Sequence, residues 1–223
     1  MDKNIKKSLI CNVIIATFVI FATICMYANI EFMGHATLLV SDSVNMLQFY
    51  TVQSNMLMGL ASILFIIYDM LLIKGKIKAI PKILYLLKLM FTTGVTVTLL
   101  TVLFYLAPVT GSNAGTLFMN ANLFYHLLVP VLAIITFVFF EKSDAIIVKQ
   151  TPYCLIPTIL YGIYYCLNIF AHTSGGSVPA EYDWYGFARG GVIVMFVVFA
   201  VMIVLTYFVI LILWNLNKTK KQS

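Results

Sequence analysis

The sequence predicts an all-α, polytopic membrane protein with six transmembrane helices. Of its 223 residues, 62% are hydrophobic and only 10% are charged, and the mean hydropathy is +1.00. These values lie outside the usual range of soluble domains. Uninterrupted apolar runs of about 20 residues, the length that crosses a bilayer, recur along the chain. We expect spans at residues 8–30, 47–73, 83–107, 121–140, 152–172 and 191–216.

The first span resembles a signal peptide because Lys3, Lys6 and Lys7 precede it. Its apolar stretch is too long for such a peptide and no clear cleavage site follows, so we interpret it as a retained anchor. No segment between the spans is long enough to fold alone, which predicts one domain over residues 1–223. The four cysteines fall inside the spans without CxxC spacing, which predicts buried apolar side chains rather than redox or metal chemistry.

The lysines predict the orientation of the chain. If the chain crosses the membrane six times, the lysines fall on one side of the membrane and Arg189 falls on the other. We expect Lys88, inside the third span, to snorkel toward the lysine side. By the positive-inside rule both termini are cytoplasmic and the loops 31–46, 108–120 and 173–190 face outward, in a cell-membrane protein. The net charge of +6 therefore flanks the spans and does not indicate a nucleic-acid partner. The flanking lysines are Lys3, Lys6, Lys7, Lys74, Lys76, Lys78, Lys82, Lys142, Lys149, Lys218, Lys220 and Lys221.

Polar residues form stripes along several spans when about 100° is assigned to each position. Polar groups are unfavourable in hydrocarbon, so these stripes are expected to face the bundle interior. The sixth span is almost entirely apolar and is predicted to be a lipid-facing wall. The stripe residues are Gln48, Thr51, Asn55, Gly59, Ser62 and Asp69 in the second span, Asn122, His126 and Pro130 in the fourth, and Tyr165, Asn168 and His172 in the fifth.

Most of this polarity belongs to the outer half of the bundle, which predicts a cavity opening outward or sideways. The inner halves are mostly apolar, and Asp69 is expected to pair with a lysine such as Lys74 at the cytoplasmic interface. Pro130 has no N–H to donate to the carbonyl of His126, four residues earlier, so a kink is expected where the imidazole projects.

Thr51 and His126 are the candidate catalytic pair, each expected about one turn inside its span and at matched depth. A hydroxyl becomes a nucleophile when a base lies within hydrogen-bonding reach, and a neutral histidine supplies one. The alternative to catalysis is that both residues have a purely structural role, in which the Thr51 hydroxyl donates to the Leu47 carbonyl of its own helix and His126 makes a hydrogen bond to another helix.

No carboxylate occupies the outer stripes, so the group that orients the imidazole is expected to be an asparagine, a tyrosine or a backbone carbonyl. Because N–H groups inside a continuous helix are already bonded, the oxyanion is expected to need side-chain donors. The candidates for substrate binding or oxyanion stabilisation are Gln48, Asn55, Asn122, Tyr165, Asn168 and His172.

Three segments resemble a known family. They are residues 49–55 (Phe-Tyr-Thr-Val-Gln-Ser-Asn), His126 followed by Pro130, and residues 182–187 (Tyr-Asp-Trp-Tyr-Gly-Phe). Together they are similar to the androgen-induced and ADTRP-like membrane proteins, above all their bacterial branch, over nearly the whole chain. The resemblance implies a six-span hydrolase of fatty acid esters of hydroxy fatty acids, with Thr51 as nucleophile and His126 as base. The Gln-Ser-Asn triplet departs from the animal pattern.

Other functions fit parts of the sequence. A transporter or channel would use the same stripes, but needs polarity that continues to the cytoplasmic side. A lipid acyltransferase would use the same pair. A metal site would draw on the histidines and on carboxylates near them in the sequence, but no pair of histidines has the i, i+4 spacing of a helical zinc site, so neither a metal nor a cofactor is expected. Those residues are His35, His126, His172, Glu31, Asp42, Glu181 and Asp183. The expected partners are a lipid substrate and the bilayer, and the oligomeric state is open.

Overall fold

The computed structural model describes residues 3–35, 43–173 and 178–219. Within them the chain is helical without strands, and six helices are long and apolar enough to cross a membrane, which confirms the predicted all-α, six-span architecture. The spans are Lys3–Tyr27, Tyr50–Ile73, Lys82–Thr110, Ala121–Phe140, Val148–His172 and Val192–Asn217. Asp42, Lys220, Lys221 and parts of two predicted outer loops lie outside the described residues.

Prolines divide three of the spans. Pro108, Pro130 and Pro157 each lie in the first turn of a new α-helical segment, the position in a helix that tolerates proline best. The third span runs through α3 (Lys82–Thr101), a π-helical turn (Val102–Leu106) and α4 (Ala107–Thr110). The fourth comprises α5 (Ala121–Leu123), a π-helical turn (Phe124–Leu128), α6 (Val129–Ile135) and a further π-helical turn (Thr136–Phe140). The fifth begins as a 3₁₀ helix (Val148–Leu155) and continues as α7 (Ile156–His172).

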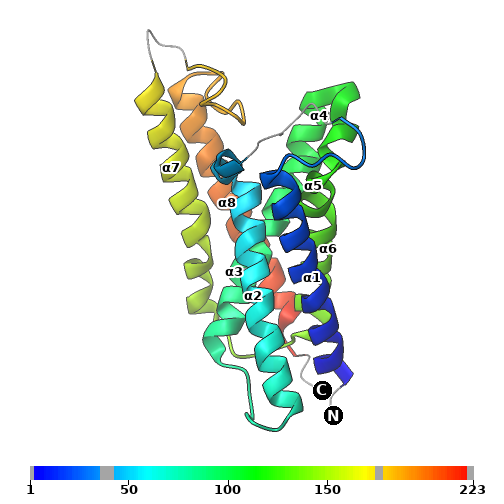
Figure 1. The fold of residues 1–223 in the computed structure, drawn as a ribbon. Coiled ribbons are helices and arrows are strands. Elements are labelled where there is room, and N and C mark those ends of the chain that lie inside the picture. Colours follow the sequence, from blue (N-terminus) through cyan, green and yellow to red (C-terminus); the bar gives the residue numbers. More distant parts are fainter. Residues whose placement is uncertain (1–2, 36–42, 174–177, 220–223) are drawn as a thin grey trace.

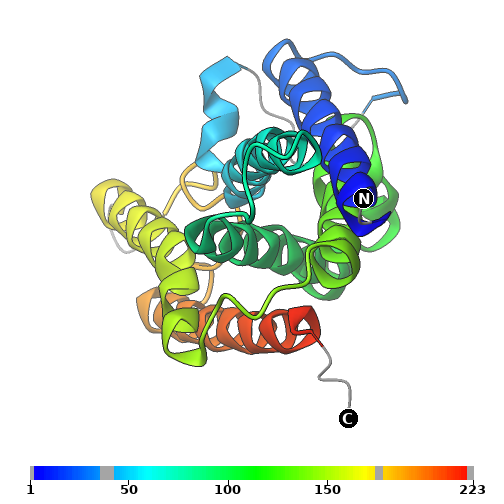
Figure 2. The same ribbon diagram turned by 90° about the horizontal axis from the view of Figure 1, so that it is seen from below.

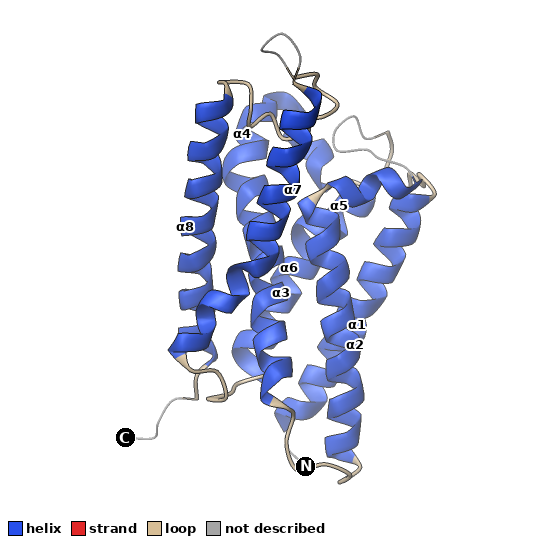
Figure 3. Cartoon of the chain, turned by 90° about the vertical axis from the view of Figure 1, so that its left-hand side faces the viewer, coloured by secondary structure: helices blue, strands red, loops and turns tan. Residues whose placement is uncertain are grey.

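At the end of the bundle opposite the termini lie two short 3₁₀ helices, Ser43–Gln48 and Gly111–Phe118. The long helices α1 (Lys3–Tyr27), α2 (Tyr50–Ile73) and α8 (Val192–Asn217) run roughly along one axis with the rest of the bundle (Figure 3). The ends of α1 and α8 that adjoin the two termini lie at the same end of the molecule (Figure 1).

The helix α3 occupies the middle of the bundle, with α1, α2 and α6 on one side and α7 and α8 on the other (Figure 2). In its span 61% of the most apolar window is buried, against 22% in α8. Large apolar side chains of α8 such as Ile193, Val201 and Phe208 point outward, which fits the predicted lipid-facing wall. The cysteine prediction also holds, since all four thiols are free and only Cys11 is partly exposed.

Two predictions about the half of the bundle nearest the termini are wrong. Lys88 does not snorkel: it is fully buried, and its Nζ lies 3.2 Å from Oε1 of Glu141. Asp69 does not pair with Lys74 at the surface, but is buried, and its Oδ2 lies 2.7 Å from the Ser8 hydroxyl oxygen. The half of the bundle nearest the termini therefore holds ionisable groups in its interior, because α1 and the end of the fourth span supply partners that the pattern of a single helix does not show.

Candidate active site

Thr51 is the second residue of α2, rather than lying about one turn inside its span. The helix begins at Tyr50, because Phe49 before it has an extended backbone (φ −84°, ψ 130°) and residues 43–48 form a separate 3₁₀ turn. The first N–H groups of a helix have no partner within it. The Tyr50 N–H donates instead to the Tyr185 hydroxyl, at 3.0 Å. The expectation that backbone donors near Thr51 are all occupied within the helix is therefore wrong.

His126 lies in the π-helical turn Phe124–Leu128 and is 1% exposed. Its Nδ1 lies 2.6 Å from the backbone carbonyl of Leu117, in the 3₁₀ helix before the span. A carbonyl only accepts, so this contact assigns the proton to Nδ1 and leaves Nε2 as an acceptor. A backbone carbonyl is one of the orienting groups that the sequence left open.

Pro130 acts one residue away from the predicted place. In the π-helical turn the Val129 N–H donates to Phe124, five residues earlier. In that register position 130 would donate to Tyr125, and proline has no N–H. The Asn55 amide donates to the Tyr125 carbonyl at 3.1 Å and to the Thr51 carbonyl at 2.8 Å. The Tyr125 carbonyl, to which position 130 would donate in this register, thus has the Asn55 amide as a donor, and Asn55 ties the fourth span to α2.

Thr51 and His126 border one small cavity. Its volume is about 10 Å³, and the other lining residues are Met26, Phe49, Val52 and Asn122. A single water needs a cavity of about 10–15 Å³. The structure therefore brings together Thr51, His126 and Asn122 around a space close to the size of one water, with Asn55 hydrogen-bonded beside them.

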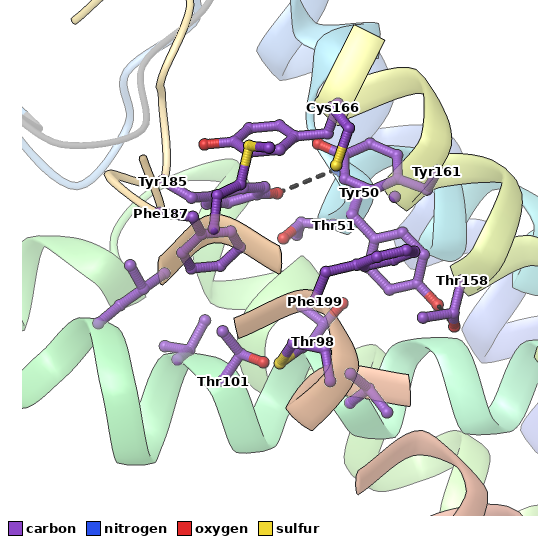
Figure 4. Close-up of a pocket in the computed structure, with 17 residues that line it drawn as sticks. Tyr50, Thr51, Thr98, Thr101, Thr158, Tyr161, Cys166, Tyr185, Phe187 and Phe199 are labelled. Atoms are coloured by element: carbon purple, nitrogen blue, oxygen red, sulfur yellow. Dashed lines mark hydrogen bonds between the residues drawn. The ribbon is translucent and has the colours of Figure 1, made fainter. Parts of the chain in front are cut away.

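Thr51 also borders a larger apolar pocket on the other side of α2, of about 70 Å³ (Figure 4). The pocket lies between α2, α3, α7 and α8. Figure 4 shows Thr51 among the rings of Tyr50, Tyr161 and Tyr185. The remaining lining residues are Val97, Thr98, Thr101, Val102, Leu106, Thr158, Gly162, Tyr165, Cys166, Phe187, Met195, Phe199 and Met202.

Residues 182–187, which we term the cover segment, close this pocket at the end of the bundle opposite the termini. Trp184 Nε1 donates to the Tyr161 hydroxyl at 3.0 Å. Asp183 accepts from the Tyr165 hydroxyl, and its other oxygen accepts the Ala188 N–H at 3.1 Å. The tyrosines of α7 thus anchor the segment over Thr51.

Tyr185 is the site residue that the sequence analysis did not single out. Its phenol contacts the Thr51 side chain as well as the first N–H groups of α2. Burial raises the pKa of the Tyr185 phenol, so it stays protonated and able to donate at neutral pH. The signal available in the sequence was the aromatic motif of residues 182–187, which identifies the segment but not the ring that reaches Thr51.

Three predicted site residues lie around the cover segment. The Gln48 carbonyl accepts from the Tyr161 hydroxyl at 2.7 Å. The Asn168 amide donates to the Tyr182 carbonyl at 2.8 Å, and the His172 ring stacks on Tyr182 with 3.6 Å between ring centroids. Asn168 and His172 thus contact the cover segment directly and Gln48 contacts Tyr161, its partner on α7, whereas Asn55, Asn122 and Tyr165 line or adjoin the two cavities.

Among the residues that the structure describes, no group of three or more histidines, cysteines and carboxylates lies close enough to hold a metal ion. His35 pairs with Glu31 at 3.0 Å on the surface. No family model, curated protein or solved structure matches this chain.

Proposed function

We propose that this protein is an intramembrane lipid ester hydrolase with Thr51 as nucleophile and His126 as general base. The observation that carries the proposal is the position of Thr51, which borders both the small cavity with His126 and the larger apolar pocket. A hydroxyl between a basic nitrogen and a space for hydrocarbon is the arrangement that ester cleavage in a membrane requires.

In the proposed reaction Nε2 of His126 takes the Thr51 proton while the hydroxyl oxygen attacks the ester carbonyl. The oxyanion then lies near the Tyr185 phenol and the first N–H groups of α2, donors at a helix N-terminus that favour negative charge. The protonated imidazole returns its proton to the departing alcohol. Water in the small cavity, activated by His126, cleaves the acyl-threonine and releases the acid.

The shape of the apolar spaces supports a substrate with two hydrocarbon chains. A groove of about 280 Å³ runs between α2, α3 and α7. It shares Tyr50 and Tyr161 with the apolar pocket of about 70 Å³ that Thr51 borders. An ester of a fatty acid with a hydroxy fatty acid has one chain on each side of its ester bond. We propose that the two chains occupy these two spaces, with the ester between them at Thr51. The water-sized cavity beside His126 favours hydrolysis over acyl transfer to a second lipid.

Transport is the second candidate function, and one observation favours it. Lys88, Glu141 and Asp69 are buried inside the bundle at the end nearest the termini. Ionisable groups inside a membrane protein commonly mark the pathway of an ion or substrate. In proteoliposomes, proton entry that depends on Asp69 would support transport. Ester cleavage that survives loss of Thr51 would remove the support for the hydrolase.

The test of the hydrolase is covalent labelling. A long-chain fluorophosphonate should modify Thr51 in the detergent-purified protein, as mapped by mass spectrometry. Thr51→Ala should abolish both labelling and cleavage of a long-chain ester. Thr101→Ala is the matched control, because Thr101 lines the larger pocket but not the cavity that contains His126. Turnover retained by Thr51→Ala, or label on another residue, would refute the nucleophile assignment.

A further inference from the structure

A network of polar side chains lies at the end of the bundle where the termini are, far along the helices from Thr51. Lys88 on α3 donates to Asn12 Oδ1 on α1 and lies 3.2 Å from Glu141 Oε1, which follows the fourth span. The Asn12 amide donates to the same Glu141 oxygen at 2.7 Å. The Ser8 hydroxyl lies 2.7 Å from Asp69 Oδ2 and 3.3 Å from Glu141 Oε1. Four spans therefore meet in one network.

The network is sealed from solvent. Lys88 and Asn12 are 0% exposed, Asp69 is 1% exposed and Glu141 is 4% exposed. With every group ionised, one ammonium and two carboxylates carry a net charge of −1, which is strongly unfavourable in a membrane interior. One added positive charge would neutralise the network.

The surrounding groups do not supply that charge. Among the described residues, the further titratable groups that interact with the network are Cys11 on α1 and Tyr85 on α3, neither of which is a cation. Lys7, next to Ser8 in the chain, is exposed and lies over the Phe140 ring. Lys142, next to Glu141 in the chain, is exposed and donates to the carbonyls of Leu216 and Lys218 instead. The Lys88 ammonium also lies 3.5 Å from the Ser62 hydroxyl and 4.8 Å from the centre of the Phe65 ring, and neither of these neighbours carries a charge.

The hydrogen atoms of the network indicate what is missing. The Ser8 hydroxyl has one hydrogen but two carboxylate oxygens beside it, so with both carboxylates ionised one of these contacts has no hydrogen. Glu141 Oε1 has Lys88 and Asn12 as further donors and is suited to carry negative charge. Among the described residues, Ser8 is the hydrogen-bond partner of the Asp69 carboxyl. A proton on Asp69 completes the set, with Asp69 donating to Ser8 and Ser8 donating to Glu141.

A separate observation points to the same ligand. Glu141 Oε2 is buried and has no hydrogen-bond partner among the described residues. A buried carboxylate oxygen without a donor is a free acceptor for an incoming proton. We propose that this network is a binding site for one exchangeable proton, held on Asp69 and relayed through Ser8 to Glu141. In the relay Asp69 gives its proton to the Ser8 oxygen while Ser8 gives its own to Glu141 Oε1, the carboxylate oxygen that it contacts, so the network gains and loses no net charge. Oε2 of the same carboxylate is the oxygen that is open to an incoming proton.

Infrared spectroscopy of the purified full-length protein tests the proposal. At pH 7 the wild type should show the carbonyl band of a protonated carboxylic acid, which shifts in D₂O. Asp69→Asn and Glu141→Gln should each remove the band, because one remaining carboxylate balances Lys88. Asp144→Asn is the matched control on an exposed aspartate and should retain it. Lys88→Met should strengthen the band, since two carboxylates then lack a cation.

Two results would overturn the proposal. One is a wild-type spectrum without the band, or a band that persists in both Asp69→Asn and Glu141→Gln. The other is loss of the wild-type band when choline chloride is replaced by sodium chloride at equal concentration, because the ligand would then be a metal cation. The two acidic variants are independent, so failure of one to fold leaves the other as the test.

Discussion

Thr51 and His126 owe their positions to irregular backbone rather than to regular helix. Thr51 lies at a helix start whose N–H groups are free to bind Tyr185, and His126 lies in a π-helical turn that Pro130 and Asn55 accommodate. π-helical turns are found frequently at functional sites. In both cases the irregular turn supplies backbone groups that bond to side chains, namely the Tyr50 N–H to Tyr185 and the Tyr125 carbonyl to Asn55, which a continuous α-helix would not.

At the residue scale, His126→Gln should lower kcat by about 10²-fold or more, the usual effect of losing a general base. Glutamine keeps a hydrogen bond to Leu117 within reach but does not cycle a proton. In the wild type the rate should rise with pH as the imidazole loses its proton and then level, because only the neutral ring accepts a proton. Steady-state ester hydrolysis across pH measures both effects.

His172→Gln is the control for that experiment, since His172 stacks on Tyr182 at the surface. It should stay near wild-type activity. An inactive His172→Gln together with an active His126→Gln would move the base to the fifth span.

At the element scale, the packing of α7 on α8 depends on Gly162. A Cβ at this position would overlap the ring of Phe199, and both residues line the larger pocket. Gly162→Ala should therefore push the two helices apart and destabilise the protein by about 1–3 kcal/mol, as overpacking usually does. Thermal unfolding in detergent measures the loss.

Gly115→Ala is the matched control, because nothing lies within 4 Å of the methyl group it would add. Phe199→Ala should relieve Gly162→Ala in the double variant. Equal stability of Gly162→Ala and the wild type would show that the two helices do not pack as described.

The elements also show what a sequence can predict. Hydropathy predicted all six spans to within a few residues, because each span must be apolar over its whole length. It did not predict that α2 starts at Tyr50, since the 3₁₀ helix Ser43–Gln48 before it contains apolar residues too. The polar stripes predicted that Thr51, Asn55, Asn122 and His126 face inward. Tyr185 lies in a loop, where no periodicity indicates which way a side chain points.

At the scale of the whole molecule, the candidate site and the charged network occupy opposite ends of the same bundle. The positive-inside rule predicts that the network end is cytoplasmic and that the site lies near the outer leaflet. Lys88 was predicted to reach the interface with the other lysines, but it is paired with Glu141 inside the bundle. Counting charges by sequence position does not distinguish these two placements of a lysine.

Cysteine labelling in intact cells tests this orientation. A membrane-impermeant maleimide should label Gly115→Cys, in the connection between the third and fourth spans, and leave Lys76→Cys unlabelled. Both positions are exposed. Labelling of Lys76→Cys instead would invert the protein and place Thr51 near the inner leaflet.

The two tryptophans give the molecule a built-in optical probe. Trp184 lies in the cover segment and donates a hydrogen bond to Tyr161 of α7, whereas Trp214 donates to the Ile146 carbonyl near the other end of the bundle. In Trp214→Phe, fluorescence therefore reports on the cover segment alone. Binding of a non-hydrolysable ether lipid should change the emission of Trp214→Phe and leave that of Trp184→Phe unchanged. An unchanged emission from Trp184 with lipid bound would mean that the lipid enters from the side, between the helices, without moving this segment.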